Sequence, residues 1–87
     1  MKKFIEKETL VRHPVINLKS TGNNIKMLRE KKGMSVKSLS EFMEFESVQA
    51  VYNWQKGRSL PSLENLLVLS ELFDEAIEGI LIYEWNF

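Results

Sequence analysis

The chain has 87 residues, of which 44% are hydrophobic and 28% are charged. This is the composition of one small domain with its own core, and it excludes a fully disordered chain. The absence of cysteine excludes disulfides and thiolate metal sites, and no apolar run approaches the roughly 20 residues that span a bilayer. We therefore expect a soluble, cytoplasmic protein with no membrane partner.

The 12 basic and 12 acidic residues balance, but their distribution along the chain is uneven. Every Lys and Arg lies before residue 59, whereas residues 59–87 carry only acids. Such a chain can present a cationic surface to an anionic partner while its net charge is zero. The alternative is a dipolar domain with no such partner, and charge alone does not decide between the two.

Residues 1–20 show no regular period, and we interpret them as an N-terminal arm that is partly extended or flexible. Pro14 biases the preceding residue toward extended backbone, and residues 15–18 resemble a short extended segment. The arm's cations would suit a phosphate backbone, although a mobile terminus is the other interpretation. These cations are Lys2, Lys3, Lys7, Arg12 and Lys19.

Two short helices are predicted next. The first covers residues 23–32, with Thr21 as its N-cap and Gly33 at its end. The second covers residues 36–43 and is capped by Ser35. A turn of about four residues follows it, which makes this segment the first half of a possible pair of helices joined by a tight turn.

The third predicted helix, residues 48–56, follows the capping residue Ser47. Its apolar residues Val51 and Trp54 are three apart, so they share the face that would pack into a core. Gln49 and Asn53 lie mostly on the opposite side. Amide side chains offer paired donors and acceptors that suit base edges, which makes this the predicted recognition helix.

A strongly amphipathic helix is predicted at residues 63–73, capped by Ser62. Its predicted core stripe is Leu63, Leu66, Leu67, Ser70 and Phe73. Leu69 and Leu72 widen that stripe, so we expect burial on two sides. A short last helix is predicted around residues 77–81, although Gly79 disfavours it.

Residues 82–87 alternate in polarity like a strand, with Tyr83, Trp85 and Phe87 on one side. This strand would pair with residues 15–18 or with its own copy in a second subunit. We expect a homodimer that forms through these three aromatic residues, because exposed aromatic clusters mark interfaces.

The sequence offers little for catalysis. It has one His and no Cys, and its acids follow neither a metal-loop spacing nor a glycine-rich phosphate loop. We therefore predict no catalytic residue, no metal site, no cofactor and no small-molecule ligand, and we do not expect an enzyme.

Residues 21–81 resemble the lambda-repressor/Cro-like (XRE-type) helix-turn-helix family. The resemblance is carried by residues 24–35, 39–40 and 51–73, including the spacing W-x-x-G-x-x-x-P-S that starts at Trp54. It implies an all-α, compact five-helix domain. In this chain the irregular N-terminal arm and the aromatic tail at residues 82–87, which we expect to form a short C-terminal strand, flank that domain. It also implies operator binding as a dimer, with the third helix in the major groove.

Carried over position by position, the resemblance assigns base reading to Gln49, Asn53, Val48 and Ser47, with capping as the alternative role of Ser47. The predicted phosphate contacts are Ser35, Lys37, Tyr52, Lys56 and Arg58, with Arg29 or Lys31 as further candidates. Trp54 is assigned to the core.

The chain departs from the family pattern at several positions. Val36 stands where a phosphate-binding Gln is common, and Glu44 stands where a Gly is common because positive φ is wanted. The turn is also one residue longer than usual and is flanked by acids. Residues 74–76, Asp-Glu-Ala, replace the expected Gly, apolar residue and Ser cap before the last helix.

The predicted function is that of a sequence-specific regulator of transcription that binds double-stranded DNA, a small repressor that acts as a dimer. The alternative is a protein-interaction module on the same fold, antitoxin-like or part of a regulatory complex, with little operator binding. The acidic C-terminal third and the aromatic tail motivate that alternative.

Overall fold

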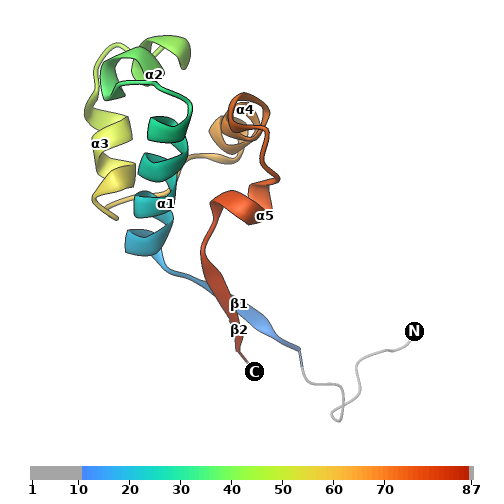
Figure 1. Cartoon of the computed structure of the whole chain (residues 1–87). Helices are drawn as coiled ribbons and strands as arrows, with labels where there is room; N and C mark the ends of the chain where they lie inside the picture. The colour runs from blue at the N-terminus through green and yellow to red at the C-terminus, as the bar shows by residue number, and fades with distance from the viewer. Residues whose placement is uncertain (1–10, 87) are drawn as a thin grey trace.

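Five helices form the body of the protein and two strands form a ribbon that extends from it in the computed structural model, which describes residues 11–86 (Figure 1). In chain order the elements are β1 (His13–Ile16), α1 (Leu18–Lys31), α2 (Val36–Phe42), α3 (Gln49–Gln55), α4 (Leu63–Phe73), α5 (Ile77–Ile80) and β2 (Tyr83–Asn86). The predicted five-helix fold with a short C-terminal strand is confirmed. Within residues 11–86, every helix is too short or too polar to cross a bilayer.

The core draws one or two apolar side chains from each helix. Its buried members are Ile25, Leu28, Leu39, Val51, Trp54, Leu66, Leu69 and Ile80. The predicted burial of Val51 and Trp54 is confirmed. The predicted stripe of α4 is wrong in part, because Leu63 and Leu67 are 68% and 57% exposed. Only one side of α4 packs on the body, so the expectation of burial on two sides is also wrong.

Helix α1 begins five residues earlier than predicted. Its N-cap is Asn17, whose Oδ1 accepts a hydrogen bond from the Ser20 N–H at 2.8 Å. The predicted cap, Thr21, is buried inside the helix, and its Oγ1 accepts from the Ile82 N–H at 2.9 Å. The first turns of α1 carry small polar residues instead of an apolar period, because α3 packs closely against them.

The other helix ends follow the prediction to within one residue. Ser35 and Ser62 cap α2 and α4 through hydrogen bonds from backbone N–H groups three residues on. Gly33 ends the α1 region with φ of 77°. The turn between α2 and α3 spans residues 43–48, two residues more than predicted, and Phe45 within it packs edge-on against Trp54 with ring centroids 5.7 Å apart.

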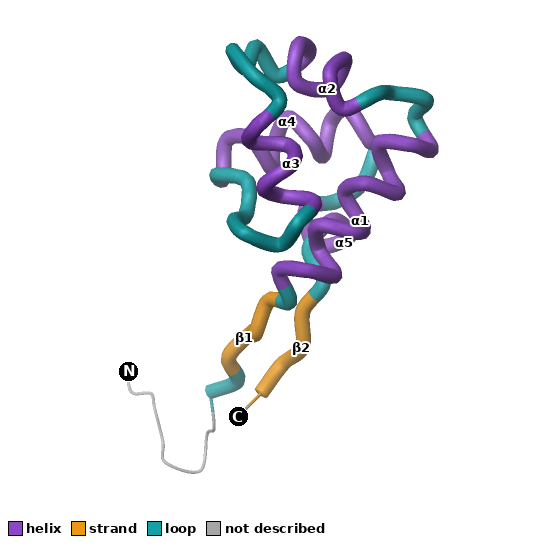
Figure 2. The backbone as a smooth tube through the Cα atoms, turned by 90° about the vertical axis from the view of Figure 1, so that its left-hand side faces the viewer, coloured by secondary structure: helices purple, strands orange, loops and turns teal. Residues whose placement is uncertain are grey.

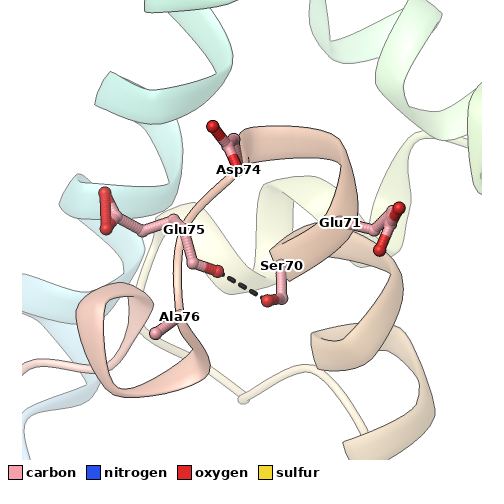
Figure 3. A pocket seen from close by; sticks show the side chains of 5 residues that line it. All are labelled: Ser70, Glu71, Asp74, Glu75 and Ala76. Carbon is pink, nitrogen blue, oxygen red and sulfur yellow. Dashed lines mark hydrogen bonds between the residues drawn. The ribbon is translucent and has the colours of Figure 1, made fainter.

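Two positions where the family resemblance implies Gly have left-handed backbone. Glu44 in the turn has φ of 62°, and Asp74, the C-cap of α4, has φ of 53°. Beyond Asp74 the Ser70 hydroxyl donates to the Glu75 carbonyl, which holds the acidic turn that Figure 3 shows from close by. Ala76 then stands at the N-cap of α5 without a side-chain hydrogen bond.

The ribbon consists of β1 and β2 in antiparallel pairing, with His13 opposite Asn86 and Ile16 opposite Tyr83. The predicted C-terminal strand is therefore confirmed. Its partner is residues 13–16, which are shifted by two residues from the predicted 15–18. The ribbon is fixed to α1, since the Asn17 N–H donates to the Ile82 carbonyl at 2.8 Å. The predictions that concern residues 1–10 and Phe87 lie outside the described residues.

Helix α1 approaches α3 so closely at Gly22 that no side chain fits there. A Cβ at this position would lie 2.1 Å from the Trp54 carbonyl oxygen and 2.9 Å from the Gln55 carbonyl carbon. Both atoms belong to backbone, so they can yield only if one helix moves. Gly22 therefore sets the distance between α1 and α3.

Gly22→Ala should destabilise the fold by about 3 kcal/mol, at the upper end for an overpacked contact because the clash is with backbone. Urea unfolding followed by circular dichroism measures this change. Asn23→Ala, an exposed neighbour in the same helix, is the control and should change stability by less than about 0.5 kcal/mol. Equal effects of the two substitutions would show that the close approach is not what limits residue 22.

Glu44→Gly should stabilise the protein by about 1 kcal/mol, because Gly adopts positive φ without the steric cost that Glu carries. Thermal and urea unfolding report the change. The matched control is Glu46→Gly, an exposed acid in the same turn without positive φ. It should destabilise through added freedom of the unfolded chain. A loss of stability in the Glu44 variant would contradict the assigned strain.

Candidate nucleic-acid interface

Helix α3 presents one face to the core and the other to solvent (Figure 2 looks onto this helix). Val51 and Trp54 point inward and are buried. Gln49 is exposed and Asn53 is half-buried. The helix spans only seven residues, so its stability comes from the packing of its inner face rather than from its own hydrogen bonds. Its outer side chains are left to contact something else.

The two predicted base readers are joined to each other. The Gln49 Nε2 donates to the Asn53 Oδ1 at 3.0 Å across one helical turn. This bond leaves the Gln49 Oε1 and one Gln49 N–H available, and it leaves both amide N–H groups of Asn53 available. The pair therefore presents an acceptor and several donors on one exposed surface, with the Gln49 amide held in a defined orientation.

The other two predicted base-facing residues lie at the start of α3. The prediction of Ser47 as the N-cap is wrong by one residue, although the Ser47 Oγ still accepts a hydrogen bond from the Gln49 N–H at 3.2 Å. Val48 is the N-cap residue and is exposed. Both residues line a shallow hollow of about 180 Å³ that also includes Lys37. The N-terminal end of α3 and the first turn of α2 thus form one surface.

The predicted phosphate contacts lie at both ends of α3. Lys37, in the first turn of α2, is exposed and lines the same hollow as the start of α3. The Ser35 hydroxyl accepts from the Ser38 N–H and so caps α2. At the other end, the Lys56 Nζ lies 6.0 Å from the centre of the exposed Tyr52 ring. Arg58 is exposed one residue beyond Gly57. A groove-bound α3 would therefore have polar groups on both flanks that can reach a backbone.

Arg29 is not part of this surface, and its candidacy as a phosphate contact is wrong. Its side chain is nearly buried between α1 and α3. The Nε donates to the Gln55 Oε1 at 2.9 Å, and Nη1 donates to the Met34 carbonyl at 2.7 Å. The sequence does not reveal this role, because an Arg exposed on one helix and an Arg that bridges two helices have the same sequence pattern. Lys31, the other candidate, is exposed.

The acids among residues 11–86 are all exposed on the surface. Glu41, Glu44 and Glu46 are exposed around the turn that precedes α3, and Glu41 and Glu46 line the same hollow as Lys37. The second group, on α4, in the turn after it, on α5 and on the ribbon, is also exposed and comprises Glu64, Glu71, Asp74, Glu75, Glu78 and Glu84. Negative charge therefore borders the N-terminal end of α3, while its C-terminal end carries Lys56 and Arg58.

Comparison with known proteins gives a consistent result. The family model described as helix-turn-helix matches residues 25–80. The restriction-modification controller protein C.AhdI from Aeromonas hydrophila is a similar solved structure, with 25% identity and a TM-score of 0.63 over 72% of this chain and 94% of that one. No curated protein matches the chain.

Two structures of the BldD DNA-binding domain, one of them from S. venezulae, are similar in fold. Each has 16% identity and a TM-score of 0.63 over 76% of this chain, and the match covers 94% and 97% of their own chains. At this identity the likeness concerns the fold alone. The family model, however, matches well over half of the chain in the segment that includes α3. The chain belongs to the XRE-type helix-turn-helix family.

Proposed function

We propose that this protein is a transcription regulator that binds double-stranded DNA sequence-specifically, a small repressor that acts as a dimer with α3 in the major groove. The observation that carries the proposal is the exposed, hydrogen-bonded amide pair Gln49–Asn53 on a helix whose opposite face is anchored in the core. Membership in the helix-turn-helix family supports it. So does the likeness to a restriction-modification controller and to domains described as DNA-binding.

The amide pair suits the base edges of the major groove. Gln49 can accept from adenine N6 through Oε1 and donate to adenine N7 with the N–H that Asn53 leaves available. The free N–H groups of Asn53 suit an acceptor on the next base pair, such as guanine O6 or thymine O4. Ser47 and Val48, at the start of the helix, would contact the adjoining step.

Phosphate contacts would position the helix without reading sequence. In this proposal Lys37 and the capped end of α2 at Ser35 hold one backbone, and Tyr52, Lys56 and Arg58 hold the other. A two-fold dimer would place two copies of α3 in successive major grooves about 34–36 Å apart, so the operator would be a palindrome. Occupying such an operator blocks access to it, which is why we propose repression.

The alternative, a protein-interaction module with little operator binding, is favoured by a specific observation. The acids of α4, α5 and β2 are all exposed, and so is nearly half of the Trp85 side chain. Selection of DNA from a random pool separates the two proposals. Enrichment of a palindrome supports the regulator, whereas a pool without enrichment supports the interaction module.

Gln49→Ala and Asn53→Ala should each weaken binding to the selected duplex by about 1–3 kcal/mol and relax base preference at one position. Fluorescence anisotropy with the selected duplex and its single-base variants measures both effects. Glu64→Ala, an exposed acid on α4, is the control and should bind as the wild type does. If both amide variants also bind and discriminate like the wild type, α3 does not read bases through this pair.

Lys37→Ala and Lys56→Ala should weaken binding to all sequences alike and should each lower the slope of log K against log salt by about 1. Titrations between about 50 and about 200 mM salt give that slope, because phosphate contacts make the affinity fall steeply over this range. Lys26→Ala removes an exposed cation of α1 that has no assigned contact, so its slope should stay at the wild-type value. A similar loss in all three variants would indicate net charge rather than placed contacts.

A further inference from the structure

The ribbon has two outer edges, and they differ. The Asn17 N–H donates to the Ile82 carbonyl, so this carbonyl faces the β1 side, while the Ile82 N–H donates to the Thr21 Oγ1 beside it. In an antiparallel pair these groups alternate in direction from residue to residue. The backbone N–H and C=O groups of Glu84 therefore also face β1, while those of Tyr83 and Trp85 face away from it.

The same alternation applies to β1, where Pro14 and Ile16 have their backbone directed outward. Proline has no N–H and its ring occupies that edge, which is how natural sheets block an edge against further strands. On β2 the outward positions are Tyr83 and Trp85, and both carry a donor and an acceptor. Among the described strands, the edge of β2 is thus the one that is able to accept another strand.

One face of the ribbon is apolar. Pro14, Ile16, Tyr83 and Trp85 share it, and together with Leu81 and Glu78 they line a hollow of about 300 Å³. Trp85 is 48% exposed although it packs edge-on against Tyr83 and lies under the Arg12 guanidinium at 4.7 Å. Two-stranded ribbons are at best marginally stable in water. An open edge beside an exposed apolar face is what an added strand would cover.

We propose that β2 pairs antiparallel with β2 of a second copy of this chain, which gives a four-stranded sheet in the order β1–β2–β2–β1. The two-fold axis passes beside Trp85, so Trp85 lies opposite Trp85 of the partner subunit. In this register the apolar faces of both ribbons lie on the same side and join. The inference rests on the dimer in the proposed function, but not on DNA binding.

Charge distinguishes the register centred on Trp85 from the one centred on Glu84. Centring the axis on Trp85 places Glu84 opposite Asn86 of the partner subunit, so a carboxylate faces an amide. Centring it on Glu84 would place two carboxylates directly opposite each other, which is destabilising. Of these two registers, the one centred on Trp85 lets β2 pair with its own copy without facing carboxylates, and this favours a second copy over an unrelated strand as the occupant.

Cysteine variants test the register, because the chain has no cysteine of its own. In the proposed sheet Glu84 and Asn86 of the partner subunit form a non-hydrogen-bonded pair with Cα atoms about 4.5 Å apart, within disulfide range. A mixture of Glu84→Cys and Asn86→Cys proteins should therefore form a heterodimer under mild oxidation, seen on a non-reducing gel. Neither variant alone should cross-link, and nor should Glu64→Cys on α4.

Trp85→Pro tests the edge itself, since it removes an outward N–H that the ribbon does not use and mimics Pro14 on the facing strand. The wild type should have the mass of a dimer by light scattering without DNA, and this variant should have the mass of a monomer with unchanged far-UV circular dichroism. The matched control Trp85→Val keeps the N–H and should remain a dimer. A mixture of cysteine variants that fails to cross-link overturns the proposal, as does a monomeric wild type. A Trp85→Pro protein that stays a dimer overturns the β2 pairing and leaves the dimeric regulator intact.

Discussion

The placement of α3 depends on how closely α1 can approach it. Gly22 makes that approach possible, because any side chain there would collide with the backbone of residues 54 and 55. Gly57 repeats the arrangement at the end of α3, where a Cβ would lie 2.9 Å from the Lys19 Cα. Further along α1, Arg29 bonds to Gln55 and to the Met34 carbonyl. Three points along α1 thus determine the position of a seven-residue helix that could not persist alone.

This support divides the residues of α3 by role. Those that hold the helix, Val51, Trp54 and Gln55, face α1 and the core, and none of them is free to contact a ligand. Gln49 and Asn53 contact each other and otherwise face outward. A change at either outer residue therefore leaves the packing intact. The same scaffold can carry different recognition surfaces, since nothing in the core depends on which amide stands at these two positions.

Local signals predicted most of the fold, and contacts between distant segments account for several of the errors. The caps at Ser35 and Ser62 depend on a few neighbouring residues, so the sequence alone reveals them, whereas the positive φ of Glu44 is expected from the family resemblance. The Asn17 cap of α1 is also local, and the prediction of Thr21 in its place is wrong, but the burial of Arg29 depends on Gln55 of α3. The apolar period of α4 likewise places Leu63 and Leu67 on the core stripe, but it does not show that both residues are exposed in the fold.

The ribbon is joined to the first turns of α1 by hydrogen bonds. Asn17 caps α1 with its side chain while its N–H bonds to Ile82, and Thr21 receives the Ile82 N–H in return. The adjacent turn of α1 is where Gly22 contacts α3. The ribbon and α3 are therefore attached to the same part of α1, at Thr21 and at Gly22. In the proposed dimer, pairing of the two β2 strands would set the distance between the two copies of α3, so the edge that joins the subunits would also select the spacing of the operator half-sites.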